Sequence, residues 1–168
     1  MQSKLPPADD RPSGLLCFAE SAEPETFSPY RLTGKGTNRK HFHDLGVSDT
    51  LSGTGIEGLS MDDRGRIDYE TMLEVDPEVL FVRGHEDESR EEFVDTVLAF
   101  MKEHGVASAL TAVENDAVYR GGPIYQGPIQ NPFLTERFAT LLFPGAYDDD
   151  ELFDRDRVAE IVNGNLNA

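Results

Sequence analysis

Residues 67–85, IDYETMLEVDPEVLFVRGH, constrain the fold more than any other segment, because they pass directly from a helix to a buried strand. Asp68 is a helix-start signal, and Pro77 stops the helix because it lacks a backbone donor and restricts the residue before it. The apolar run at residues 79–82 is β-branched and aromatic, which is typical of a strand covered on both faces. The expected apolar face of the helix consists of Tyr69, Met72 and Leu73.

Alternating strands and helices continue on both sides of this unit. They predict an α/β fold, a three-layer α/β/α sandwich with a mostly parallel central sheet. We expect residues 1–14 to be a polar linker and residues 15–168 to form one domain, since this length can bury a sizeable core. Residues 20–33, with prolines and several polar residues, are expected to form a loop. The further expected strands are 15–19, 48–51 and 117–120. One expected helix is capped by Thr37 or Asn38 and runs to about Leu45, and another starts at Asp87 or Ser89 and is ended by Gly105. The last two expected helices are about 131–142 and 154–162.

The chain is strongly acidic, with 32 aspartates and glutamates against 15 lysines and arginines and a formal net charge of -17 at pH 7. Because binding to a polyanion requires a basic surface, this composition argues against nucleic acid as a partner. The acids are scattered along the chain rather than confined to one tail. Repulsion on this scale destabilises a folded state until salt screens it, which favours a salt-loving source over an ordinary acidic protein.

Cys17 is the single cysteine, so the chain can form neither an intrachain disulfide nor a cysteine-cluster zinc site. It lies within the apolar strand expected at residues 15–19, where we expect a buried, unreactive thiol. No segment approaches the roughly 18 to 20 consecutive apolar residues that a membrane-spanning helix needs. The first 14 residues lack the apolar core of a signal peptide.

Two glycine-rich segments resemble nucleotide-binding motifs but fail their spacing or context. Residues 34–37 lack the first glycine of a Walker motif and the hydroxyl residue directly after the lysine, although Lys35 and nearby amides could contact an anion. Residues 53–58 match G-x-G-x-x-G, but no clear strand precedes them and no strong helix follows. His41 and His43 lie on different faces of an expected helix, so they do not form a metal pair. We therefore expect no cofactor, no metal site and no enzyme activity.

Polar side chains follow several expected strands, and open α/β sheets bind ligands at the carboxyl ends of their strands. The segment 120–130 combines arginine, tyrosine and glutamine with glycines, which suits a polar or anionic ligand. A solvated loop is the alternative interpretation of this segment and of the Tyr30-Arg31 pair. The candidate ligand-binding residues, expected to share one rim, are Tyr30, Arg31, Arg83, His85, Arg120 and Tyr125.

Residues 68–73, followed by Pro77 and the strand 79–82, resemble a helix–strand unit of a known family. The family is that of the periplasmic siderophore- and cobalamin-binding proteins, which are the substrate-binding components of ABC importers, and the unit belongs to their C-terminal lobe. Further segments resemble the same lobe in the same order. These are 38–47 (a helix ending in Leu-Gly), 110–119 (L-x-A-V, a turn, then V-Y) and 133–144 (a helix and a proline). The resemblance covers about residues 15–159.

The resemblance implies a two-lobe protein in which each lobe is an α/β domain and the ligand lies between the lobes. This chain would be the C-terminal lobe without the N-terminal lobe, either as a piece of a longer protein or as a half-sized relative. The implied partners are an ABC permease subunit, the missing N-terminal lobe and a small metal chelate, an iron siderophore or cobalamin. The arginines among the candidates favour an anionic iron chelate. The implied location is extracytoplasmic, with the full-length protein tethered to the cell surface.

Glu70 matches a second functional position of this family, in which each lobe offers an acidic residue to an arginine pocket on the permease. It is expected in the first turn of a helix, where the helix dipole favours a carboxylate. The apolar residues of that helix already occupy its inward face. We therefore predict an exposed Glu70 that docks onto the permease, and the alternative is an acid that only stabilises the helix start.

A different function is compatible with the same elements. The chain could be a stand-alone flavodoxin-like α/β domain with an interaction or regulatory role and no part in transport. A small enzyme that uses the strand ends is a third class, and it is disfavoured because no nucleophile–base pair or metal-ligand set is visible.

The net charge leads to a prediction about stability. We expect the midpoint temperature of thermal unfolding to rise from low salt to molar potassium or sodium chloride, because salt screens the repulsion among the excess carboxylates. Differential scanning calorimetry across a salt series measures this shift. A midpoint that stays constant or falls with added salt would contradict the salt-loving interpretation.

Overall fold

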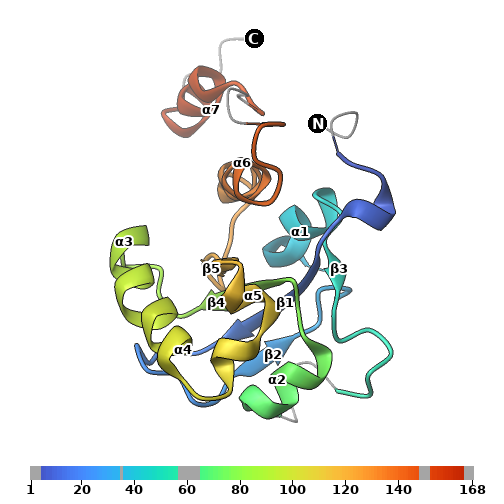
Figure 1. Ribbon diagram of the computed structural model, residues 1–168. Helices are drawn as coiled ribbons and strands as arrows, with labels where there is room; N and C mark the ends of the chain where they lie inside the picture. Colours follow the sequence, from blue (N-terminus) through green and yellow to red (C-terminus); the bar gives the residue numbers. More distant parts are fainter. Residues whose placement is uncertain (1–4, 35, 57–64, 148–151, 165–168) are drawn as a thin grey trace.

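A five-stranded, mostly parallel sheet lies at the centre of the computed structural model (Figure 1). The structure describes residues 5–34, 36–56, 65–147 and 152–164. β1 pairs in parallel with β4, and β4 pairs in parallel with β5. On its other side, β1 pairs in parallel with β3 near its start and antiparallel with β2 near its end. The strands are β1 (Ser13–Phe18), β2 (Ser28–Tyr30), β3 (Ser48–Asp49), β4 (Val79–Arg83) and β5 (Val118–Arg120).

Helices cover both faces of this sheet, which confirms the three-layer α/β/α fold (Figure 1). The α-helices are α1 (Lys40–Asp44), α2 (Tyr69–Val75), α3 (Arg90–Phe93), α4 (Ala99–Glu103), α5 (Thr111–Glu114), α6 (Gln130–Leu142) and α7 (Arg155–Val162). Shorter elements are the 3-10 turns η2 (Ala8–Asp10), η3 (Thr37–Arg39) and η5 (Ala107–Ala109), and the π-helical segment η4 (Val94–Leu98) that joins α3 to α4. Among the described residues, no helix is both long and apolar enough to cross a membrane.

Alternate residues of the central strands supply two separate cores, as the two-residue period of a strand requires. Leu15, Cys17 and the β4 residues Leu80 and Val82 join the core beneath α2, α4 and α5. Leu16 joins the opposite core beneath α1 and α6, together with the remaining apolar residues of β4. Cys17 is fully buried, and burial raises the pKa of its thiol, in agreement with the expected unreactive cysteine.

The predicted helix boundaries rest on side-chain caps that the structure contains. The Asp68 side chain accepts a hydrogen bond from the backbone N–H of Thr71 at the start of α2. Asp76 ends that helix in the left-handed region at φ 34°, directly before Pro77. Ser89 forms a complete capping box at the start of α3. The helix–strand unit predicted at residues 67–85 is therefore confirmed.

Some expectations about local structure are wrong. The expected loop at residues 20–33 contains β2, a three-residue strand with Pro29 at its centre. Proline is tolerated there because β2 is an edge strand and needs no hydrogen bond on its outer side. Leu73, expected on the inward face of α2, is 36% exposed, and only Tyr69 and Met72 are buried on that helix. β1 begins at Ser13, slightly before the segment that the apolar pattern indicated.

Gly84 permits the close approach of β1 and β4 at their carboxyl ends. Its φ is +108°, and a Cβ at this position would lie 2.5 Å from the carbonyl oxygen of Ala19. Ala19 in turn donates its backbone N–H to the carbonyl of Arg83 at 3.0 Å. A larger residue at Gly84 would combine backbone strain with a backbone clash, so this position requires glycine.

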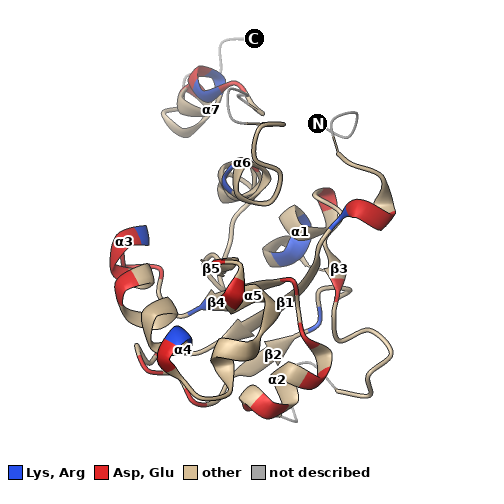
Figure 2. Ribbon diagram, viewed as in Figure 1, with Lys and Arg blue, Asp and Glu red and all other residues tan. Residues whose placement is uncertain are grey.

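Acidic and basic residues both occur on several helices, and short basic segments also lie beside the sheet near β4 and β2 (Figure 2). The acids are spread over several helices rather than gathered on one face. α7 extends beyond α6, away from the sheet, and none of its residues is buried (Figure 1).

His41 is a buried titratable group in the α1–α6 core. Its ring stacks on Phe138 with the ring centroids 5.3 Å apart and contacts Phe42 at 4.1 Å. Neither ring nitrogen has a hydrogen-bond partner among the residues that the structure describes. Burial, assisted by the positive charges of Arg83 and Arg137, lowers the pKa of His41 from 6.5 to about 3.

This burial predicts acid sensitivity. Between about pH 6.5 and about pH 3, the unfolded chain binds a proton at His41 that the folded chain does not, so protonation favours unfolding. Above about pH 6.5, His41 is neutral in both states and does not change the free energy of unfolding with pH. Below about pH 6.5, each pH unit lowers the free energy of unfolding by up to about 1.4 kcal/mol. Urea unfolding from about pH 7 to about pH 4 should show a steeper loss for the unaltered protein than for His41→Phe. Equal pH slopes in the two proteins would contradict this prediction.

Candidate functional site

The carboxyl ends of β1, β4 and β5 meet at one edge of the sheet. Phe18 pairs with Arg83, and Val82 pairs with Arg120, so the last residues of the three strands are aligned. The backbone N–H of Gly121 also donates to the carbonyl of Val82 at 2.7 Å. The loops that follow the three strands are therefore neighbours, at the place where open α/β sheets bind ligands.

Arg83 is the last residue of β4 and is fully buried. Nη2 donates to the carbonyl of Asn38 at 2.5 Å, and Nε donates to the carbonyl of Gly121 at 3.4 Å. Within the described ranges, Nη1 has no hydrogen-bond partner and the guanidinium has no ion-pair partner. Burial lowers the pKa of Arg83 to about 10, so the side chain stays cationic at neutral pH. Tyr30 and the half-buried carboxylate of Glu86 stabilise this charge from nearby, although neither forms an ion pair with it at contact distance.

Tyr30 on β2 lies between two arginines. The guanidinium carbon of Arg83 is 5.2 Å from the centroid of the Tyr30 ring, and that of Arg39 is 6.0 Å from it. Arg39 is held in place because its Nη1 donates to the carbonyl of Arg31 at 3.0 Å. Both arginines are therefore in cation–π range of the same ring.

A concave cavity of about 740 Å³ opens beside Tyr30. Its walls are the loop that follows β1, with Glu20 and Glu25, the arginines Arg39 and Arg66, and the aromatic ring of Tyr30. Ile124 and Tyr125 also line it. The volume and the mixture of aromatic and charged walls suit a small polar ligand.

Tyr125 stands at the boundary between this cavity and a second hollow of about 490 Å³. Its side chain is 91% exposed, which is unusual for a large aromatic residue. The loop that carries it is fixed against η3, because Asn38 donates to the carbonyl of Ile124 at 3.3 Å and Thr37 donates to the carbonyl of Gln126 at 3.4 Å. Tyr125 is therefore an exposed ring on an anchored loop.

Two of the candidate ligand-binding residues make contacts inside the protein. Arg31 donates from Nη1 to the carbonyl of Leu51 at 2.6 Å. His85, directly beyond β4, is only 2% exposed. Its Nδ1 lies 2.8 Å from a carboxylate oxygen of Glu88, and its ring packs edge-on against Phe93.

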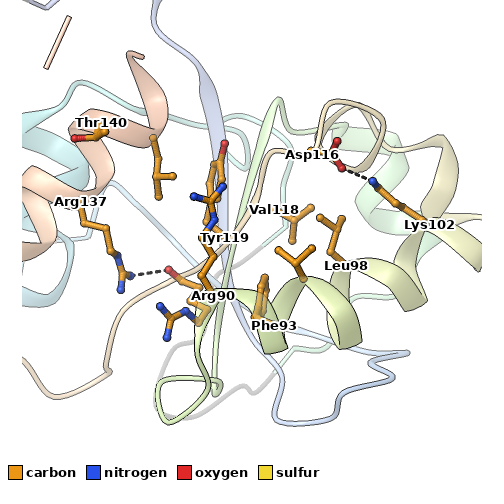
Figure 3. Close-up of a pocket in the computed structure, with 12 residues that line it drawn as sticks. Arg90, Phe93, Leu98, Lys102, Asp116, Val118, Tyr119, Arg137 and Thr140 are labelled. Atoms are coloured by element: carbon orange, nitrogen blue, oxygen red, sulfur yellow. Dashed lines mark hydrogen bonds and ion pairs between the residues drawn. The ribbon is translucent and has the colours of Figure 1, made fainter. Parts of the chain in front are cut away.

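Arg120 lines a different cavity, of about 600 Å³, between α6 and the helix formed by α3, η4 and α4 (Figure 3). Its Nη1 donates to the carbonyl of Glu88, and its own carbonyl accepts a hydrogen bond from Arg137 at 2.8 Å. Of the six candidates, Tyr30 and Tyr125 line one cavity, and Arg83 is buried against the Tyr30 ring. The other three, Arg31, His85 and Arg120, are held in other contacts.

Glu70 is exposed in the first turn of α2, as expected from its position after the Asp68 cap. Tyr69 and Met72 point into the core from the same helix. The carboxylate of Glu70 is thus free to contact another protein, and its docking role remains a proposal.

Sequence reasoning missed Arg39 and Arg66 as wall residues of the cavity. Arg39 follows the glycine-rich loop 34–37, which was considered for anion binding, so its position next to that loop was a usable signal. Lys35 of that loop and part of the 53–58 motif lie outside the described residues. Arg66 reaches the cavity because neighbouring Ile67 forms an isolated antiparallel bridge with Phe27. Such a bridge joins distant segments, so no local sequence pattern predicts it.

The sequence profile of the periplasmic binding protein family matches residues 3–125, which is more than half of the chain. The chain belongs to the periplasmic binding protein family. The members are binding proteins, which supports the expectation that this chain is not an enzyme. In the part of the chain that the structure describes, no group of three or more His, Cys, Asp or Glu residues could hold a metal ion.

Solved structures of this kind share the fold. The TroA-like periplasmic binding protein FepB from Veillonella parvula aligns with 92% of this chain and 44% of its own, at 18% identity and a TM-score of 0.57. An ABC-type Fe³⁺-hydroxamate transport protein from Saccharomonospora viridis aligns with 80% of this chain and 42% of its own, at 20% identity and a TM-score of 0.53. CeuE from Helicobacter pylori, solved with Ni(II) bound, aligns with 94% of this chain and 46% of its own, at 16% identity and a TM-score of 0.53.

The chain spans less than half the length of each of these three structures. At such identities, the similarity establishes the fold of this periplasmic binding protein segment. No curated protein sequence matches the chain significantly.

The buried guanidinium of Arg83 leads to a prediction about folding. Replacement by Met removes a desolvated charge but also removes the hydrogen bond to the Asn38 carbonyl, so the two effects oppose each other. We expect the free energy of unfolding of Arg83→Met to stay within about 1 kcal/mol of that of the unaltered protein. Chemical denaturation at neutral pH measures the difference. A loss of more than about 3 kcal/mol would show that Arg83 is retained for stability instead.

Proposed function

We propose that this chain is the C-terminal lobe of a solute-binding protein of an ABC importer and that it supplies one wall of the ligand cleft. The observation that carries the proposal is the rim at the carboxyl ends of the strands, where buried Arg83 underlies Tyr30 and Tyr125 projects into solvent. Family membership and a length below half that of the solved relatives support the assignment to one lobe.

The proposed ligand is an anionic metal chelate of the iron-siderophore class. Arg39 and Arg66 line the cavity beside Tyr30, and buried Arg83 packs against the Tyr30 ring. These three cations outnumber the two carboxylates of the cavity wall, Glu20 and Glu25, within a chain of net charge -17. An arginine guanidinium donates two parallel hydrogen bonds to paired oxygens such as those of a carboxylate. An exposed tyrosine ring can pack against a planar chelating group. The Fe³⁺-hydroxamate relative and the Ni(II) complex of CeuE support a metal-linked ligand. Cobalamin is the competing ligand, and it offers less anionic charge to these arginines.

The lobe alone is expected to bind weakly. The cavity of about 740 Å³ is lined from one side, by the β1 loop, Tyr30 and the loop that carries Tyr125. A ligand held between two lobes makes many of its contacts to the second wall, and the entropic cost of binding is the same without them.

Equilibrium dialysis of the chain tests this function with three coloured or radiolabelled probes of different charge: anionic ferric enterobactin, neutral ferrichrome and cyanocobalamin. We expect ferric enterobactin to be retained most strongly and Tyr125→Ala to weaken its retention. Tyr119→Phe is the matched control, because Tyr119 lies in the other cavity. Stronger retention of ferrichrome or cyanocobalamin would overturn the anionic class. Retention of none of the three, with the protein concentrated enough to detect weak binding, would favour a stand-alone α/β interaction domain.

The proposed partners follow from the same assignment. An ABC permease subunit would receive the ligand, and an N-terminal lobe would close the cleft, in an extracytoplasmic protein tethered to the cell surface. The coding sequence upstream tests the lobe assignment: an in-frame second lobe with a lipoprotein signal, beside permease and ATPase genes, would support it. A gene that encodes only this lobe, far from transporter genes, would oppose it.

Docking through Glu70 gives a separate prediction for the two-lobe protein. We expect Glu70→Arg to lower transport while ligand affinity holds, because an exposed carboxylate on α2 would be replaced by a charge that repels a permease arginine. An isolated exposed ion pair is worth only about 0–1 kcal/mol, so the reversal of charge is a more sensitive test than Glu70→Ala. Glu74→Arg is the control, since Glu74 is exposed one turn further along the same helix.

Transport and affinity must be measured separately in these variants. Loss of ligand affinity in Glu70→Arg would place the residue in the cleft rather than at the permease. Equal loss of transport in both variants would show that any reversal of charge on α2 has this effect, and it would contradict a specific docking role for Glu70.

A further inference from the structure

The cavity between α6 and the α3–η4–α4 helix lies apart from the proposed ligand cleft. Its volume is about 600 Å³, and none of its lining residues lines the cavity beside Tyr30. Figure 3 shows Arg137 and Thr140 of α6 on one side, Phe93 and Leu98 on the other, and the β5 residue Tyr119 between them. The cavity therefore runs along the outer edge of β5, the last strand of the described sheet.

Its floor is apolar. Leu98 and Val118 belong to the larger hydrophobic core, and Val94 is an exposed residue of the lining. A pocket of this size with apolar walls and a few polar groups has the properties of a small-molecule site. The apolar lining residues are Phe93, Val94, Leu98, Val118 and Leu141.

Its rim is basic, although the chain as a whole is strongly acidic. Four of the 15 lysines and arginines line this one cavity, which is a large share for a protein of net charge -17. Lys102 is paired with Asp116, so its charge is neutralised locally (Figure 3). The other three rim cations are Arg90, Arg120 and Arg137.

These three arginines are incompletely neutralised. Arg120 and Arg137 donate to backbone carbonyls, which carry no net charge. One half-buried carboxylate, Glu86, lies near both of them, and burial raises its pKa, so it offers at most a single opposing charge. Arg90 is exposed at this cavity, and among the described residues no side-chain hydrogen bond or ion pair of Arg90 is present.

The position of Arg90 is itself unfavourable for the helix. It is the first residue of α3, where the helix dipole disfavours a positive charge. Neighbouring acids at that helix start already suit the dipole, whereas Arg90 does not. Because Arg90 lines an apolar cavity, its charge is available to an anionic ligand there.

We propose that this cavity binds an amphiphilic anion, with an alkyl chain on the apolar floor and a carboxylate head group on the arginine rim. A carboxylate suits the head-group position because guanidinium groups bind it through paired hydrogen bonds. An aliphatic tail suits the floor because its wall residues are mostly Val and Leu. The ligand class is a medium-chain fatty acid, and the site is independent of the metal-chelate cleft.

The test is a methyl-detected NMR titration of the 168-residue chain with decanoate, kept below micelle-forming concentrations. Decanol and decyltrimethylammonium are the controls, because they share the alkyl chain and differ in head-group charge. We expect decanoate to bind at least about tenfold more tightly than decanol, and the cation to bind least. The shifted methyl groups should be those of Leu98, Val118 and Leu141, whereas Ile124 of the other cavity should not move.

Two charge-reversal variants locate the head group. Arg90→Glu should abolish the preference for decanoate over decanol without unfolding α3, since an acid is favoured in the first helical turn. Arg157→Glu makes the same change of charge on α7, outside the cavity, and should leave the preference intact.

The outcomes separate the proposal from its competitors. Equal affinity for decanoate and decanol would show apolar partitioning only and would overturn the proposed anion site. Shifts confined to Ile124, or a decanoate preference that survives in Arg90→Glu, would place the anion elsewhere. Absence of any saturable shift in the Leu98 and Val118 methyl groups would also overturn the proposal.

Discussion

The parallel pairing of β1 with β4 is the interaction on which the rest of the structure depends. Five residue pairs, from Gly14 with Val79 to Phe18 with Arg83, align the two central strands. Their alternating side chains define both cores, so a shift of the register by one residue would exchange the contents of the two layers. The same pairing brings the ends of the strands together, where Gly84 allows the backbones to approach. Fold and candidate site therefore share one origin.

Local signals account for much of the fold. The caps Asp68 and Ser89 and the stop at Pro77 are visible in the sequence because they act within one helical turn. β2 was missed because its stability comes from pairing with β1, and Pro29 argues against a strand when it is considered alone. The candidate site was predicted less completely. Strand ends could be located from the sequence, but the burial of His85 depends on packing between distant elements.

The distribution of charge follows a consistent division. Most acidic residues of the described helices are exposed, where their repulsion is solvated and screened by salt. Several arginines instead pack near the sheet and hydrogen-bond to backbone carbonyls, as Arg83, Arg120 and Arg137 do. Carbonyl acceptors hold a guanidinium in place without cancelling its charge. A strongly acidic protein can in this way keep positive potential inside its cavities while its surface stays negative.

The two cores differ in which parts of the chain complete them. Val118 is the last residue along the chain that belongs to the core beneath α2, α4 and α5. The core beneath α1 and α6 also contains the later residues Leu134, Phe138 and Phe143. During synthesis from the N-terminus, α2, α4 and α5 can cover one face of the sheet before α6 has left the ribosome. The other face stays uncovered until α6 is available. Until then, the nascent chain exposes one apolar side of β1 and β4. The order in which the layers close is thus built into the order of the elements along the polypeptide.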